Sequence, residues 1–311
     1  MKKLFIALFA VAAATACSND EFVSVDREAI DFGTPFIDKS TRAAVDPSYG
    51  GGVNEFTQFQ VWGTANGVAI FAGENVNGTV GTNVVEGKET HVWTCTKKNY
   101  WVKGVNYDFA AVANGTVTAL ANGLPKTIEY TANGTSDLIY AENKGITGQA
   151  AGSNVPVAFT FSHLLAKVKF TATTNTDVEG YSYEISNITI ENAYDSGVYT
   201  VSDKTWDSLA KTNGQSFDSI TLNKTTKTAE CAQEKLLIPI AAADKVTVSC
   251  TITLKYGEDT IWSDSPTVTV NTGLTAAHAY NFTIACNVGE EITFSVVDDP
   301  SWTNGGNVTV Q

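Results

Sequence analysis

The chain has 311 residues, of which only 17% are charged and 43% are hydrophobic, and its formal net charge is −13. So acidic a chain, with only two arginines, excludes nucleic acid and anionic membrane surfaces as partners, because both require a basic patch. Valine and threonine favour strands, while asparagine and glycine favour turns, so a chain rich in all four is predicted to be all-β.

The N-terminus has the pattern of an export signal. Two lysines precede the apolar segment Leu4–Ala14, and small residues lead directly to Cys17. The apolar segment is too short to span a bilayer as a helix. A cysteine after small residues resembles a bacterial lipobox, so residues 1–16 are predicted to be a lipoprotein signal peptide and Cys17 the lipidated residue. A plain signal peptide that happens to contain a cysteine is the alternative.

Residues 17–42 form the next unit, which we interpret as a leader. A flexible linker has little use for large apolar side chains, and this segment contains several. At least one short strand is therefore expected here. The apolar residues of the leader are Phe22, Val23, Val25, Ile30, Phe32, Phe36 and Ile37.

From residue 53 onward the sequence reads as short strands separated by polar turns, the pattern of β-sandwiches. Asn-Gly pairs, the strongest short hairpin signal, occur at 66–67, 77–78, 114–115, 122–123 and 133–134. Residues 118–124 are expected to form a turn of helix. Strands are expected at 59–61, 68–72, 92–96, 107–112, 183–190, 198–201, 219–222, 235–240, 245–256, 260–262, 267–270, 279–287 and 291–297.

The segment Val155–Thr173 contains a break in the strand pattern. Its first half places odd-numbered apolar residues on one face and its second half even-numbered ones, so the pattern slips by one residue across Ser162–Leu165. A slip of one residue turns every side chain to the other face of a sheet. Two strands that face different cores are therefore predicted, with N-terminal domain 43–161 and C-terminal domain 162–311. Both are expected to be Greek-key-type β-sandwiches of the transthyretin or immunoglobulin kind.

No motif indicates catalysis, a metal or a cofactor. The histidines His91, His163 and His278 lie far apart, without the spacing of a metal site. His163 is interpreted as a structural histidine. The pairs Glu290-Glu291 and Asp298-Asp299 are interpreted as solvated charge, because adjacent residues on a strand face opposite ways. We therefore predict that the protein is not an enzyme.

The four cysteines after Cys17 are interpreted as buried thiols, since Cys250 and Cys286 lie in phase with apolar strand positions. A Cys250–Cys286 disulfide is the alternative if their strands are neighbours. The tryptophans could stack on sugars if they are exposed, although packing is the favoured interpretation for each. The tryptophans concerned are Trp101, Trp206, Trp262 and Trp302.

Several short motifs resemble the fimbrillin family, the type V pilins of Bacteroidales. They include the lipobox ending at Cys17, the segment Ser40–Ala43, and Phe161-Ser162-His163-Leu164-Leu165-Ala166-Lys167-Val168, which matches the family pattern Phe-x-His-x-Leu-Ala-Lys-Val. Further matches are 59–63, Tyr100-Trp101, 107–111, 137–141, 274–284 and Trp302. One departure is His278-Ala279, where a glycine commonly precedes the tyrosine in the family.

The resemblance implies a pilus subunit that supports adhesion or colonisation. Such a subunit reaches the outer membrane and cell surface as a lipoprotein, held in lipid through Cys17, and a protease then cuts after Arg42 so that Ala43 becomes the first residue. Loss of the leader opens a groove in the N-terminal domain, which a C-terminal strand of another pilin subunit fills. The candidate donor residues are Ile292, Phe294, Val296, Val308 and Val310.

Two alternatives accompany this interpretation: an uncleaved pilus-anchor lipoprotein, and a surface lipoprotein that binds glycans. Host or bacterial glycans and proteins are therefore possible further partners. Three Asp-Ser/Thr-aliphatic triplets also resemble O-glycosylation sites of this bacterial group. Their acceptor residues are Ser208, Ser219 and Thr260.

Overall fold

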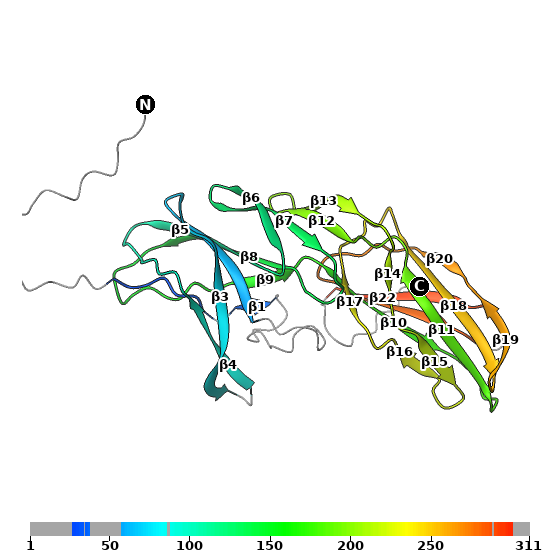
Figure 1. The fold of residues 1–311 in the computed structure, drawn as a ribbon. Helices are drawn as coiled ribbons and strands as arrows, with labels where there is room; N and C mark the ends of the chain where they lie inside the picture. Colours follow the sequence, from blue (N-terminus) through cyan, green and yellow to red (C-terminus); the bar gives the residue numbers. More distant parts are fainter. Residues whose placement is uncertain (1–26, 34, 38–56, 86–87, 288, 301–311) are drawn as a thin grey trace, which may run out of the picture.

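The computed structural model describes residues 27–33, 35–37, 57–85, 88–287 and 289–300. Within these ranges the chain contains strands and turns and no helix, which confirms the predicted all-β class. The molecule is elongated and has two lobes (Figure 1). The predicted positions Cys17, Arg42, Ala43, Val308 and Val310 lie outside the described residues, as does Trp302.

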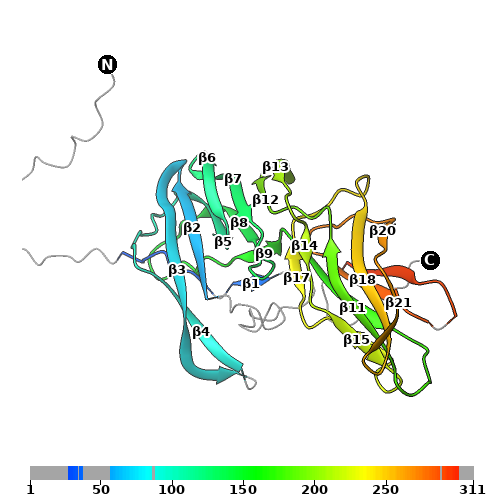
Figure 2. The same ribbon diagram turned by 45° about the vertical axis from the view of Figure 1, so that its right-hand side comes forward.

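The first lobe is built on a seven-stranded sheet. Its long hairpin of β3 and β4 extends well beyond the other strands (Figure 2). In spatial order the strands are β1 (Phe36–Ile37), β9 (Thr160–His163), β8 (Ile139–Thr147), β5 (Asn106–Ala113), β2 (Gln58–Ala65), β3 (Val68–Val85) and β4 (Lys88–Cys95).

A four-stranded sheet covers one face of this sheet. Two of its strands come from the first half of the chain and two from the second, so the sheet crosses the division predicted at residues 161 and 162. In spatial order its strands are β13 (Thr205–Ala210), β12 (Ser196–Thr200), β7 (Leu124–Thr131) and β6 (Thr116–Ala121).

Two Asn-Gly pairs form the predicted hairpin turns. Asn66-Gly67 joins β2 to β3 and Asn122-Gly123 joins β6 to β7, with positive φ at all four residues. Asn77-Gly78 was predicted wrongly as a turn, because both residues lie inside β3 and pair with β4. The helical turn predicted at 118–124 is also wrong, since β6 and its pairing with β7 occupy it.

The second lobe is a sandwich of two sheets. One contains β16 (Thr228–Glu230), β10 (Ala166–Thr173), β21 (Ala279–Ala285) and β22 (Thr293–Asp299), with β17 (Lys235–Leu237) also paired to β10. The other contains β14 (Gln215–Ser216), β11 (Tyr181–Ile190), β18 (Val246–Tyr256) and β19 (Asp259–Asp264), with β15 (Ile220–Asn223) on β11 and β20 (Thr267–Val270) on β18.

The predicted slip across 162–165 lies between β9 and β10. Phe161 packs in the core of the seven-stranded sheet, whereas Val168 packs in the core of the second lobe. Leu164 and Leu165, between the two strands, belong to a third core under the four-stranded sheet. A change of face within a few residues thus lets one segment contribute to three apolar cores.

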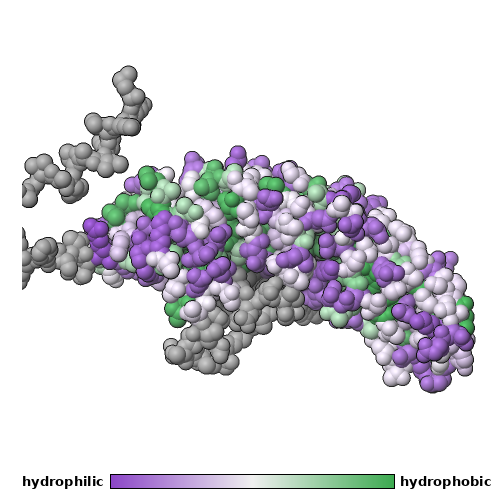
Figure 3. Space-filling model, viewed as in Figure 1, coloured by the Kyte–Doolittle hydropathy of each residue, from purple (hydrophilic) through white to green (hydrophobic). Residues whose placement is uncertain are grey.

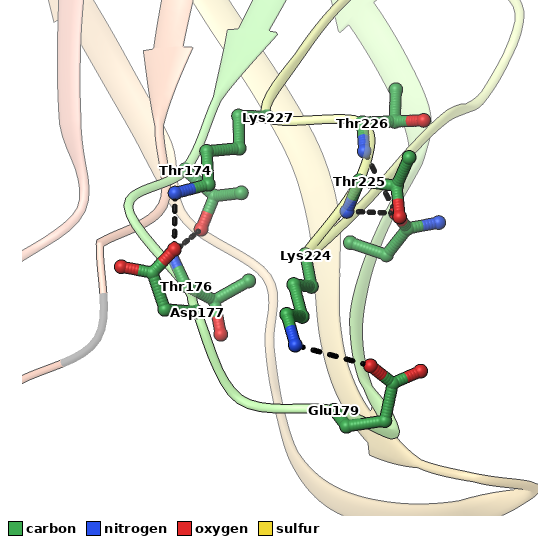
Figure 4. Close-up of polar contacts among 9 residues, drawn as sticks. Thr174, Thr176, Asp177, Glu179, Lys224, Thr225, Thr226 and Lys227 are labelled. Atoms are coloured by element: carbon green, nitrogen blue, oxygen red, sulfur yellow. Dashed lines mark hydrogen bonds and ion pairs between the residues drawn. The ribbon is translucent and has the colours of Figure 1, made fainter.

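At the far end of the second lobe, short loops are tied together by polar contacts (Figure 4). Lys227 pairs with Asp177, and Lys224 Nζ lies 3.3 Å from a carboxylate oxygen of Glu179. Hydrophilic residues are concentrated at this end in Figure 3. These pairs are exposed, so they orient the loops while the buried core supplies the stability.

The cysteines Cys95, Cys231, Cys250 and Cys286 are free and buried, as the sequence pattern favoured. Cys250 lies on β18, whereas Cys286 directly follows β21, a strand of the opposite sheet. Burial raises the pKa of Cys250 to about 12 and that of Cys286 to about 11, so both thiols stay protonated and unreactive at neutral pH.

Phe170→Ala should lower the free energy of unfolding by about 3–5 kcal/mol, measured by urea denaturation. The Phe170 ring is fully buried between Phe217, at a centroid distance of 4.8 Å, and Phe282, at 5.3 Å. Ile261→Ala is the control, because Ile261 is 55% exposed, and it should change stability by no more than about 0.5 kcal/mol. Similar losses in the two variants would contradict this assignment of the core.

Candidate functional site

The described part of the leader, residues 27–33 and 35–37, lies inside the first lobe, with bridges at Ala29 and Phe32 and the short strand β1 at Phe36–Ile37. Its side chains alternate, so that Ile30 and Phe32 point into the core and are 1% and 5% exposed, while Asp31 is exposed. The prediction of a short strand in the leader is confirmed by β1, which pairs with β9. The leader completes the core of the seven-stranded sheet rather than lying over its surface.

Phe32 is the centre of an aromatic cluster. Its ring lies edge-on to Phe71, at a centroid distance of 5.5 Å, and stacks on Phe159 at 6.1 Å. Phe59 and Phe109 contact it edge-on at 6.4 and 6.3 Å. These distances and orientations are those preferred by aromatic pairs, and each pair adds to the gain from simple burial. A side chain of aromatic size is therefore needed at this position.

The leader backbone pairs on both of its sides. On one side it runs antiparallel to 99–101, where Ile30 N–H donates to Asn99 O at 2.8 Å and Trp101 N–H donates to Glu28 O at 2.9 Å. On the other side it runs parallel to the segment entering β9, with Gly33 N–H donating to Val157 O at 2.9 Å. Removing the leader would expose unpaired backbone groups on both walls of an apolar groove.

Glu28 fastens the start of the leader to a neighbouring loop. Its carboxylate oxygen Oε2 accepts hydrogen bonds from the Asn154 side chain at 2.5 Å and from the backbone N–H of Gly152 at 2.9 Å. These bonds, with the Asn154 side chain first, hold the pKa of Glu28 below its usual value of 4.5. We call Glu28 with Gly152 and Asn154 the latch.

The candidate donor residues lie at the edge of the second lobe. Strand β22 pairs with β21 alone among the described strands. Ile292, Phe294 and Val296 are partly buried and pack on the second-lobe core. The structure does not bring them to the groove of their own chain, which the leader occupies.

A cleft of about 800 Å³ lies beside the four-stranded sheet. It is lined by aromatic residues that include Tyr140, Tyr199 and Trp206, together with acidic Glu142 and Asp244. Burial raises the pKa of Tyr140 far above its usual value, so its hydroxyl donates to Glu142, at 2.5 Å. Among the described residues, the buried Trp206 indole N–H has no hydrogen-bond partner.

The other residues singled out from the sequence range from buried to exposed. His163 is buried with its Nδ1 2.5 Å from Asp137 Oδ2, which confirms its structural role, and His278 Nδ1 lies 2.8 Å from Asp298 Oδ1. Trp101 is in the core, whereas Trp262 is 41% exposed. The predicted glycosylation acceptors Ser208, Ser219 and Thr260 are all exposed, and their modification stays a prediction.

The described part of the chain shows no group of three or more His, Cys, Asp or Glu residues placed to hold a metal ion. It also has no helix with the length and apolar character needed to cross a bilayer.

A family model described as fimbrillin-like matches residues 41–298, which is most of the chain. The chain belongs to the fimbrillin-like family. The match confirms the family indicated by the short motifs and supports a structural role as a subunit of a cell-surface fimbria. Comparison with curated proteins found no relative.

Solved structures share the fold of this fimbrillin-like protein at low sequence identity. A fimbrial protein from Bacteroides vulgatus is 13% identical, with a TM-score of 0.61, and the match covers 89% of this chain and 100% of that one. A candidate cell adhesion protein from Bacteroides uniformis is 18% identical, with a TM-score of 0.50 and coverage of 79% and 92%. A second one, from Bacteroides ovatus, is 16% identical, with a TM-score of 0.50 and coverage of 90% and 99%.

The sequence predicted a short strand in the leader, with Ile30 and Phe32 among its apolar residues, but did not predict the latch or the antiparallel wall at 99–101. Tyr100-Trp101 was one of the motifs shared with the family, but the motif did not indicate that this segment pairs with the leader. Asn154 follows a glycine- and alanine-rich segment and carried no signal of its own.

The latch should make stability depend on pH. A depressed carboxyl pKa stabilises the folded state above the unfolded value, near 4.5, and that contribution is lost as the pH falls through the folded value. Glu28→Gln should therefore melt at a lower temperature than the wild type at about pH 6, and the gap should close toward about pH 3. Glu258→Gln, at an exposed turn, is the control. A gap that stays constant with pH would contradict the latch.

Proposed function

We propose that this fimbrillin-like protein is a pilus subunit that is exported as a lipoprotein, cut after Arg42 and polymerised by strand exchange. The observation that carries the proposal is the leader: it is buried as a core strand and is followed within a few residues by Arg42. A folded subunit does not need a core strand that is cut away, unless another strand takes its place. The lipid on Cys17 would hold the precursor at the outer membrane until cleavage.

The energetics favour a groove that is always filled. Burial of Ile30 and Phe32 gains roughly 1.5–3 kcal/mol each as an upper estimate. The backbone bonds on the two walls add about 1 kcal/mol each. These gains are opposed by the cost of ordering the strand, and they favour an occupied groove over one whose apolar walls are exposed.

The donor would be the C-terminal segment of another subunit. Strand β22 suits this role because it has one neighbouring strand in its own sheet and its apolar residues are incompletely buried there. Its departure would break one ladder, and its insertion into a groove would form two. The net negative charge would keep the resulting fibre soluble.

The cleft beside the four-stranded sheet favours a second candidate function, the binding of a glycan. Its aromatic rings offer faces for the apolar side of a sugar, and Glu142 and Asp244 offer hydrogen-bond acceptors. Surface glycans would then be the adhesion ligand of the subunit.

Arg42→Gln should abolish SDS-resistant ladders of the surface protein, because the leader would stay in the groove. Protein shaved from wild-type cells should begin at Ala43, measured by N-terminal sequencing. Deletion of Ile292–Gln311 should also abolish the ladders, since it removes the donor. Ladders that persist in either variant would sink the proposal, and a mature protein that still begins at an acylated Cys17 would favour the anchor alternative.

Trp206→Ala should weaken the binding of any glycan found on an array by about tenfold or more, since the loss of one stacked ring removes roughly 1–2 kcal/mol. Trp262→Ala is the matched control, because its ring is exposed outside the cleft. No glycan bound by the wild type, or an equal loss in both variants, would exclude the cleft as a glycan site.

A further inference from the structure

Two segments near opposite ends of the chain share one pattern, Glu-x-Ile-x-Phe. It occurs at Glu28–Phe32 in the leader and at Glu290–Phe294, which begins before β22 and ends within it, and nowhere else in the 311 residues. In an extended strand this spacing places the three defined side chains on the same side. In the leader, each of them has an identified place in the groove or the latch.

We propose that β22 enters the groove of a second copy of this chain in the register of the leader, so that Glu290, Ile292 and Phe294 take the places of Glu28, Ile30 and Phe32. This inference rests on the proposed function, because the leader must leave before β22 can enter. It assigns the donor register and makes the partner a second copy of the same chain.

The two apolar residues gain burial in this register. Ile292 and Phe294 are only partly buried at the edge of the second lobe, whereas the positions of Ile30 and Phe32 are 1% and 5% exposed. Phe294 would lie in the aromatic cluster that surrounds Phe32. Transfer of the strand from a sheet edge to a closed groove is therefore favoured by the apolar area removed from water.

Glu290 matches the latch. At present it accepts a hydrogen bond from the Asn287 side chain at 2.8 Å, in an exposed turn. In the place of Glu28 it would accept bonds from the backbone N–H of Gly152 and from the Asn154 side chain, and hydrogen bonds to an ionised carboxylate are stronger than neutral ones. A register displaced by two residues would put Ile292 or a residue before Glu290 there and leave these donors without an anion.

The shared pattern has the same chain direction in both segments, which fixes the neighbours of β22. It would run antiparallel to 99–101 and parallel to the segment at Val157, as the leader does. Ala29 lies opposite Tyr100 between two flanking hydrogen bonds, which makes them a non-hydrogen-bonded pair. In the proposed register Glu291 lies opposite Tyr100 of the second copy.

Disulfide trapping in the full chain tests this register. Cα atoms of a non-hydrogen-bonded antiparallel pair are about 4.5 Å apart, within the range that a disulfide bridges. Glu291→Cys combined with Tyr100→Cys should give ladders that survive boiling in SDS without reductant and collapse when reductant is added. Both positions are exposed, so the variant should fold.

Thr293→Cys with Tyr100→Cys is the matched control, because Thr293 is exposed on the same side of β22 but two residues out of register. We expect at least tenfold less covalent ladder from it. Ala29→Cys with Tyr100→Cys should form an intramolecular disulfide in the uncut precursor. This bridge would show that a cysteine at position 100 can form a disulfide with a strand in the groove.

The outcomes separate the two levels of the proposal. Covalent ladders from the Thr293→Cys pair would overturn the register and leave strand exchange standing. The same conclusion would follow if the wild-type protein polymerised but neither cysteine pair gave covalent ladders. The absence of polymers from wild-type protein with an N-terminus at Ala43 would overturn strand exchange, and the register with it.

Discussion

The insertion of Phe32 among the aromatic side chains of the first lobe is the interaction on which the rest of the structure depends. The ring contacts residues from β2, β3, β5 and the segment entering β9, so it joins elements that are far apart in the sequence. Such a cluster cannot be satisfied by water, and a smaller side chain would leave a cavity. The lobe is complete only when a strand with an aromatic residue at this point is present.

This constraint links stability to assembly. A strand that supplies core contacts and bonds to two backbone walls is tightly held while the chain is intact, and is replaceable only by a strand of similar pattern. The leader is such a strand within the chain, and the start of β22 has the same arrangement of acidic, aliphatic and aromatic residues. In the proposed register, one groove would account for the two matching segments.

The hydrogen bonds of the latch select the alignment of the strand in the apolar groove. Ile30 and Phe32 would gain burial in more than one alignment, because apolar contact is not directional. The bonds from Gly152 and Asn154 to the Glu28 carboxylate favour one alignment, because they form only when a carboxylate lies at that position. The ion pairs at the far tip of the second lobe are exposed and contribute little to stability.

Period-two patterns and the slip across 162–165 determined the all-β class and most strands, because these follow from local alternation. Local sequence failed at β6 and β7, where the four-stranded sheet draws β12 and β13 from the second half of the chain. Asn77-Gly78 shows the same limit, since pairing with β4 overrides its turn propensity. Only the tertiary structure decided where the leader lies and which donors meet Glu28, because residues more than 100 positions apart form those contacts.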